Sequence, residues 1–294
     1  MQYSTCPIDG SFAMEIMDMR LWEAQTPQTV AGLRRLFGEH GILVFRRQSL
    51  SEDEFADFCS HFGVLERTVR TDWASKVRPE IGLITNLKDF DGRALGGLGD
   101  GEVEWHSDQA YMLNPATGSG LYGVEIAHQG GTTSWANLAL AYQALPERLK
   151  AQVEGKRAIF SYPKRLRGFK GADQMISEEA RQRTPDVVHS LVHVNPVSGQ
   201  KALYLDPTTT IGIVGMPDDE ANALLDELAQ FAVRPEFLYN HRWQVGDVLL
   251  WSNGFLMHRR EPFPSSERRL LKRSTMILPR DFHIVPDGQL LQAA

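Results

Sequence analysis

The first regular pattern in the chain is an amphipathic stretch over residues 29–40, whose apolar positions recur every three or four residues. The apolar run Ile42–Phe45 follows at once and predicts a buried strand. Ser51 and Glu54 then match a capping box, which predicts a second helix that turns its phenylalanines inward and ends at Gly63. Helix, strand and helix would make the opening layer of a larger sheet.

Short strands and amphipathic helices alternate along the rest of the chain. The expected strands are 121–127, 247–251 and 273–278, and the expected helices are 138–145, 147–153 and 217–233. Many short strands broken by Gly and Pro, with helices mostly at the edges, indicate an α+β protein with a double-stranded β-helix (jelly roll) core and flanking helices. No domain boundary is visible, so we expect a single domain over residues 1–294.

Two segments lack a regular pattern. Gly96, Gly97, Gly99 and Gly101 crowd into six residues, and we expect a mobile loop there. The stretch 161–184 is basic and irregular. Loops of this kind often act as lids over a binding site, so both segments are lid candidates.

Composition narrows the function further. The apolar fraction of 42% and the charged fraction of 23% are those of a globular protein, and the net charge of -6 is spread along the chain. Because no basic stripe or polybasic run is present, we expect no nucleic-acid or membrane partner. The two cysteines, Cys6 and Cys59, offer no disulfide framework. Residues 1–12 lack the pattern of a signal peptide, so neither feature indicates secretion. We therefore expect a cytoplasmic enzyme.

The first chemical motif is Trp105-His106-Ser107-Asp108. Residues two apart on a strand point to the same face, so His106 and Asp108 could bind one metal ion together. An imidazole and a carboxylate are two of the three ligands in the 2-His-1-carboxylate triad of non-haem Fe(II) oxygenases. Taken alone the triplet is a weak signal, since a surface histidine beside an acid gives the same pattern.

Three further motifs share the chain with this triplet. Gly130-Gly131-Thr132-Thr133 follows a strand and would by itself indicate only a glycine turn. Trp251-Ser252-Asn253 leads to His258 at a predicted strand end, where a structural histidine is the alternative. Arg269 and Arg273 share one face of the last strand; a solvated basic face is the alternative, but two arginines near a metal suit a bidentate carboxylate.

Taken in order, these motifs resemble the TauD/TfdA family of taurine and 2,4-dichlorophenoxyacetate dioxygenase-like enzymes. The resemblance covers nearly the whole chain. It rests on ordered segments of this sequence: GILVFRRQSLSEDEFADFCSHFG, WHSD, GGTT, AYQALP, HVNPVSGQKALYL, HRWQVGDVLLWSNGFLMHR and RRLLKR. Ordered segments with fitting separations are far more specific than any single triplet.

The resemblance implies an Fe(II)- and 2-oxoglutarate-dependent dioxygenase that uses O2. It makes His106, Asp108 and His258 the metal ligands. It places Thr133 and Arg269 on the distal carboxylate of 2-oxoglutarate, and Arg273 near the iron, within reach of the substrate's anionic group or the near carboxylate of the co-substrate. It also places Trp251 close to the metal, where plain core packing is an equally good interpretation. Asp108 argues against a halogenase, which needs that ligand position vacant.

The chain departs from the family pattern at three places. The family commonly has Trp-Asp-Asn before the distal histidine, and this chain has Ser252 in place of the aspartate. The glycine motif is GGTT where GGDT is usual, although Thr133 is kept. Glu102 occupies the position of an asparagine that holds the substrate in taurine-type enzymes. An acid there hints at a cationic or amino-acid-like substrate, and a solvent-facing glutamate is the alternative.

The expected reaction is oxidation, most simply hydroxylation, of an unactivated C–H bond of a small, anionic or amino-acid-like molecule, giving succinate and CO2. The alternatives are a non-catalytic small-anion binding protein and a zinc-using jelly-roll protein, neither of which would need Thr133 and Arg269 at family spacing. The resemblance also makes a homodimer or homotetramer possible. The sequence does not identify the substrate.

Overall fold

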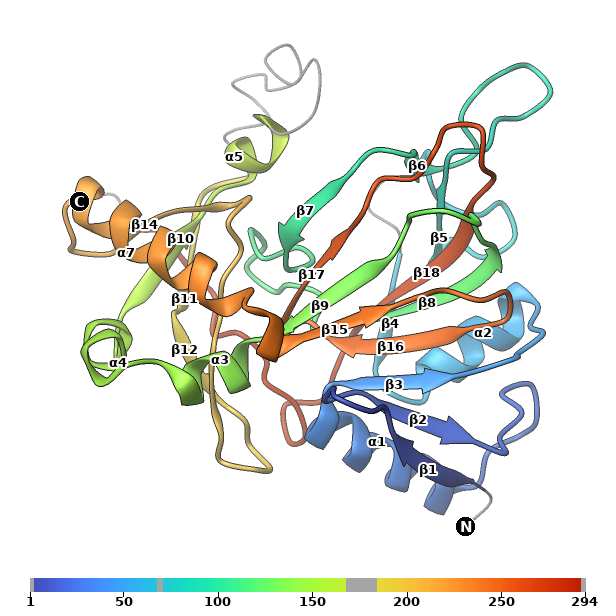
Figure 1. Cartoon of the computed structure of the whole chain (residues 1–294), viewed down its shortest axis with the longest axis horizontal. Coiled ribbons are helices and arrows are strands. Elements are labelled where there is room, and N and C mark those ends of the chain that lie inside the picture. Colours follow the sequence, from blue (N-terminus) through green and yellow to red (C-terminus); the bar gives the residue numbers. More distant parts are fainter. Residues whose placement is uncertain (1–2, 68–70, 168–183, 292–294) are drawn as a thin grey trace.

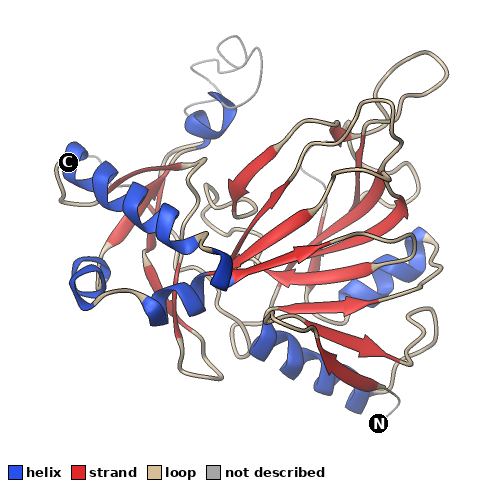
Figure 2. Ribbon diagram, in the orientation of Figure 1, coloured by secondary structure: helices blue, strands red, loops and turns tan. Residues whose placement is uncertain are grey.

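The computed structural model describes residues 3–67, 71–167 and 184–291, and of Arg167 only the backbone. Within these residues the chain forms one nine-stranded sheet, two four-stranded sheets, a two-stranded sheet and helices that lie mostly along the edges (Figures 1 and 2). The architecture is mixed α and β, as the hydrophobic pattern predicts.

The largest sheet of the described chain has nine strands. Its order is β1 (Ser4–Pro7), β2 (Met14–Met17), β3 (Ile42–Phe45), β16 (Val248–Ser252), β8 (Gly118–Glu125), β18 (Leu270–Ile277), β5 (Ile81–Thr85) and β6 (Gly97–Leu98), with β4 (Val64–Glu66) paired to β18. The sheet joins both ends of the chain, since β3 pairs with β16 more than 200 residues later.

A second sheet carries the first chemical motif. Its order among the described strands is β15 (Leu238–His241), β9 (Thr133–Asn137), β17 (Leu256–Arg260) and β7 (Val103–His106). One hydrophobic cluster takes residues from both sheets, including Leu121 and Leu249 of the larger sheet and Trp135, Tyr239 and Leu256 of the smaller one. The two sheets therefore pack on each other across a shared core.

Two helices cover the nine-stranded sheet (Figure 1). In α1 (Pro27–His40), Thr26 caps the N-terminus and Gly41 ends the helix in the left-handed conformation. The predicted capping box opens α2 (Glu52–Ser60), which ends three residues before the predicted Gly63. The apolar faces of both helices join a single core cluster with the sheet, so the opening layer predicted from the sequence is confirmed.

A smaller lobe packs beside the two sheets. Its helices are α3 (Leu138–Ala144), α4 (Glu147–Val153), α5 (Tyr162–Arg167), α7 (Asp218–Ala232) and the short 3-10 helix η2 (Pro235–Phe237). Its four-stranded sheet has the order β14 (Thr210–Ile213), β10 (Arg157–Phe160), β11 (Val187–Ser190) and β19 (Gln289–Leu290). A separate pair is formed by β12 (Val192–Val194) and β13 (Lys201–Leu203). The helices predicted at 138–145, 147–153 and 217–233 are all present. The hairpin β1–β2 and most strands of this lobe were not predicted.

Both lid candidates need correction. The glycine segment is not a free loop: β6 pairs in parallel with β5, and a Cβ on Gly97 would fall 2.2 Å from the Trp73 ring. That glycine serves close packing. In the other segment, residues 162–167 form α5 rather than irregular chain, and residues 168–183 lie outside the described part.

Both cysteines are free thiols; Cys6 is exposed and Cys59 is buried. In the described ranges, no helix has the length and apolar character needed to cross a bilayer.

Candidate metal centre and co-substrate cavity

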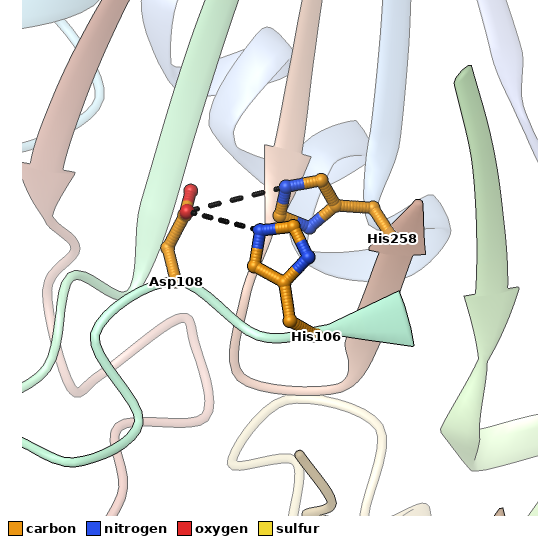
Figure 3. Close-up of side chains that lie close together, drawn as sticks. All are labelled: His106, Asp108 and His258. Carbon is orange, nitrogen blue, oxygen red and sulfur yellow. Dashed lines mark ion pairs between the residues drawn. The ribbon is translucent and has the colours of Figure 1, made fainter. Parts of the chain in front are cut away.

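The register between β7 and β17 brings two histidines together. In this antiparallel pair His106 lies directly opposite His258, and their ring centroids are 4.1 Å apart. Asp108 follows two residues after His106, so that three candidate ligand atoms, one from each residue, lie within 4.8 Å of one another (Figure 3). The Asp108 Oδ1 atom is 3.8 Å from His106 Nε2 and 4.0 Å from His258 Nε2.

Two local expectations about these residues are wrong. Asp108 does not lie on the strand with His106, because β7 ends at His106 and the aspartate belongs to the turn that follows. His258 is not at a strand end but in the middle of β17, next to a register shift between His258 and Arg260.

Hydrogen bonds hold the ligand side chains in place. The backbone carbonyl of Glu104 lies 2.8 Å from His106 Nδ1, which leaves Nε2 available as a metal ligand. Ser119 donates to Asp108 Oδ2 at 2.9 Å and accepts from Asn253 Nδ2 at 3.1 Å. Ser119 and Asn253 are thus functional neighbours of the metal site, and sequence reasoning assigned them no role.

The protonation states suit a divalent cation. Burial, followed by the neighbouring charges of His258 and Arg165, lowers the pKa of His106 to about 3. Burial also lowers the pKa of His258 to about 4. Burial alone would raise the pKa of Asp108, but the positive charge of Arg273, the two neighbouring imidazoles and the Ser119 hydrogen bond offset it, so this pKa lies well below its usual value.

Two neutral imidazoles and one carboxylate therefore face a common point at neutral pH. This donor set is the one that non-haem Fe(II) oxygenases use, with the remaining positions left open. Arg273 Nη1 lies 3.3 Å from Asp108 Oδ1, so one partly buried cation already faces the centre.

A cavity adjoins the two histidines. It is lined by Ile84, Leu98, Val103, His106, Leu121, Thr133, Trp251, His258, Arg260, Arg269 and Arg273. Of the residues singled out in the sequence, the cavity brings together both histidines, Thr133, Trp251, Arg269 and Arg273.

The far wall of the cavity is prepared for an anion. Arg269 is only 2% exposed, and its Nη1 has no hydrogen-bond partner in the described structure. Gly131 has a positive φ of 68°, and a Cβ there would lie 3.2 Å from Arg269 Nε, so the backbone closes tightly around the guanidinium. Thr133 accepts a hydrogen bond from Trp243 Nε1 at 2.9 Å, which leaves its own hydroxyl proton to donate.

Three other residues differ from the expectation or add to it. Trp251 is fully buried and also lines the cavity, so packing and proximity to the metal both apply. Glu102 is exposed and lies in a separate hollow with Glu104 and Trp105, not in the cavity. Arg260 lines the cavity and was missed, although its position two residues after His258 on the same strand could have indicated it.

Comparison with known proteins agrees with this geometry. The family model described as "Taurine catabolism dioxygenase TauD, TfdA family" matches residues 4–275. The chain belongs to the TauD/TfdA family. Among TauD/TfdA relatives it is similar to the alpha-ketoglutarate-dependent 2,4-dichlorophenoxyacetate dioxygenase of Cupriavidus pinatubonensis, with 34% identity over 92% of this chain and 96% of the relative.

Two further similar proteins extend the comparison. The (S)-phenoxypropionate/alpha-ketoglutarate-dioxygenase of Sphingobium herbicidovorans is 29% identical over 92% of this chain and 94% of its own. The crystal structure of AAD-2 in complex with Mn(II) and N-oxalylglycine matches with a TM-score of 0.80 and 27% identity, over 95% of this chain and 98% of that chain. The chain is thus an oxidoreductase of the TauD/TfdA type, which uses Fe(II), 2-oxoglutarate (alpha-ketoglutarate) and O2.

Proposed function

We propose that this dioxygenase oxidises, most simply by hydroxylation, an unactivated C–H bond of a small anionic molecule, and that residues 1–294 form one domain around a jelly-roll core. One observation carries the assignment of the site. Two histidines and an aspartate converge beside a cavity whose far wall holds a buried arginine without a carboxylate partner among the described residues. A metal centre alone would not need that arginine.

In this proposal His106, Asp108 and His258 hold the ferrous ion. When bound, the ferrous ion and 2-oxoglutarate together activate O2 and supply the oxidant that removes hydrogen from the substrate, with release of succinate and CO2. The Ser119 hydroxyl and the Glu104 carbonyl fix the directions of Asp108 and His106, so that three ligand atoms are preorganised on one side. Ser252, the departure from the family pattern, is fully buried, and its hydroxyl has no hydrogen-bond partner among the described residues.

Thr133 and Arg269 hold the carboxylate of 2-oxoglutarate that is remote from the metal. The Thr133 hydroxyl proton and the Arg269 Nη1 group both lack an acceptor among the described atoms of the protein, and a carboxylate would satisfy both. Burial lowers the pKa of Arg269 to about 9, which still leaves the guanidinium protonated at neutral pH. Arg269 therefore brings to the cavity a positive charge that forms no ion pair with a carboxylate among the described residues.

The charges around the metal favour an anionic primary substrate. Arg273 stands beside Asp108, and Arg165 lies close enough to lower the pKa values of both histidines. The rings of Tyr111 and Tyr162 are in tilted contact nearby, with centroids 4.8 Å apart, and the charges of Asp108 and Arg273 act on the pKa of Tyr111. Two relatives are named for phenoxyacetate and phenoxypropionate substrates, in which a carboxylate and an aromatic ring are joined.

This assignment predicts a preference within a matched substrate panel. An aryloxyalkanoate should stimulate succinate formation more than the amine that replaces its carboxylate, because the cations near the metal repel an ammonium group. The measurement is succinate released under air with each compound. A preference for the amine would contradict the anionic assignment and support the substrate role predicted for Glu102. That role stays a prediction; the exposed Glu102 side chain lies outside the cavity.

Binding of the co-substrate can be tested without any primary substrate. Anaerobic addition of Fe(II) and 2-oxoglutarate should produce a weak visible charge-transfer band, because the co-substrate chelates the iron through its keto and carboxylate oxygens. A spectrum recorded with Zn(II) in place of Fe(II) is the control. The absence of a band, together with no succinate when air is admitted, would favour the small-anion binding or zinc-using alternatives.

A further inference from the structure

Arg260 is a buried cation with an unusual set of partners. It is 5% exposed, lies opposite Thr133 in the register of β17 and β9, and lines the cavity. Its Nη2 donates to the backbone carbonyls of Leu98, at 3.0 Å, and Gly101. Its Nε and Nη1 have no hydrogen-bond partner in the part of the chain that the structure describes. If the guanidinium served only to hold the backbone of residues 98–101, its remaining N–H groups would be expected to have hydrogen-bond acceptors as well.

A second buried guanidinium lies close to it. The ring of Phe263 is 5.3 Å from the Arg260 guanidinium carbon and 5.6 Å from that of Arg269. No ion pair joins either arginine to a carboxylate among the described residues. Burial lowers the pKa of Arg260 to about 10, although the nearby Asp100 carboxylate acts in the opposite direction. Burial together with the Arg260 charge lowers the pKa of Arg269 to about 9.

Two buried guanidinium groups with donors that lack acceptors favour an anion beside them. A protonated guanidinium that loses water without a partner pays a large desolvation cost, which a carboxylate between the two would offset. The family resemblance assigns one arginine and one threonine to the remote carboxylate of the co-substrate, and those are Arg269 and Thr133. Arg260 is additional, and its neighbour across the strands is that same threonine.

We propose that Arg260 is a second guanidinium for the remote carboxylate of 2-oxoglutarate, and that through its bonds to Leu98 and Gly101 it couples this binding to the order of residues 98–101. The inference rests on the proposed function. The free Nε and Nη1 bind the anion together with Arg269, while Nη2 keeps the segment beside the cavity. Arg260 is a binding and positioning residue, since nothing places it on the metal.

The test compares three variants: Arg260→Met, Arg260→Lys and, as matched control, Arg259→Met. Arg259 is the next residue on the strand and stacks on Trp105 outside the cavity. Calorimetric titration of the Mn(II)-loaded proteins with 2-oxoglutarate should give a Kd at least about tenfold higher for Arg260→Met than for the wild type. We expect a smaller increase for Arg260→Lys, which keeps the charge without the fork, and no change for Arg259→Met.

A second readout follows the loop itself. Glu102 is exposed directly after this segment, so cleavage there by a glutamate-specific protease reports its order. With the wild type and Arg259→Met, 2-oxoglutarate should slow cleavage; with Arg260→Met it should not. Circular dichroism establishes that each variant is folded, and if Arg260→Met is not, Arg260→Lys takes its place in both measurements.

Failure of the inference and failure of the proposed function look different. If the wild type binds 2-oxoglutarate and a folded Arg260 variant binds it equally well, with equal protection at Glu102, Arg260 is only structural and the inference is overturned. If the wild type itself binds no 2-oxoglutarate, the proposed function falls, and this inference with it.

Discussion

Replacing Asp108 or His106 by alanine is expected to abolish succinate formation while leaving the protein folded. Each change removes one of the three metal ligands. No other described acid or histidine belongs to this ligand group and could replace the lost one. Loss of Asp108 also removes the carboxylate that faces Arg273, but that arginine keeps 23% of its side chain exposed, so water can solvate its charge. Succinate release, Fe(II) content and the thermal unfolding midpoint together measure the outcome.

A surface aspartate provides the matched control. Asp219 lies at the exposed start of α7, and Asp219→Ala should retain both iron and activity. Ser119→Ala, which removes the hydroxyl from Asp108 but no ligand, should fall between the two, with a loss of about 10–100-fold in metal affinity or activity. Succinate production retained in either ligand variant would refute the assignment of the metal site.

Arg269→Ala is expected to raise the KM for 2-oxoglutarate by about tenfold or more, with a smaller effect on kcat. A charge-assisted hydrogen bond to a carboxylate contributes roughly 1.5–3 kcal/mol, and the remote carboxylate would lose that contact both in the ground state and during the reaction. Arg269 is almost completely buried, so no mobile surface cation can take its place. The measurement is initial rate against 2-oxoglutarate concentration at saturating substrate and iron.

The neighbouring residue, Arg268, provides the matched control for Arg269→Ala. Arg268 is exposed and forms two hydrogen bonds with Glu125, so Arg268→Ala changes the charge by the same amount outside the cavity. Its KM for 2-oxoglutarate should equal that of the wild type. Equal KM values for both variants would remove Arg269 from the co-substrate site, even if the metal ligands are correct.

The sequence predicted the residues of the site better than it predicted their local structure. His106, Asp108 and His258 come together as expected, because ligand types and order are carried by the motifs. The cross-strand pairing of the two histidines, and the turn that holds Asp108, depend on the register between strands about 150 residues apart. No local pattern encodes that register, so the sequence alone could not give it.

The glycine segment shows a different limit. Clustered glycines predict conformational freedom, but the same residue type also allows close approach, and Gly97 packs under the ring of Trp73. Whether a glycine provides conformational freedom or close packing depends on the residue that lies next to it in the folded protein. Arg260 was missed although strand alternation could have indicated it: of the two arginines after His258, only the second shares the face of the histidine, and it is the one that lines the cavity.

The ladder between β7 and β17 also bears on the metal-free protein. Ordinary strand pairing places His106 opposite His258. Most of the conformational entropy that ordering the site costs is therefore already lost when the chain folds. Stripping the ion with a chelator should therefore yield an apoprotein that is native in shape and regains activity on resupply of ferrous ion. In this respect the chain differs from small zinc-nucleated domains, which unfold when their ion is withdrawn.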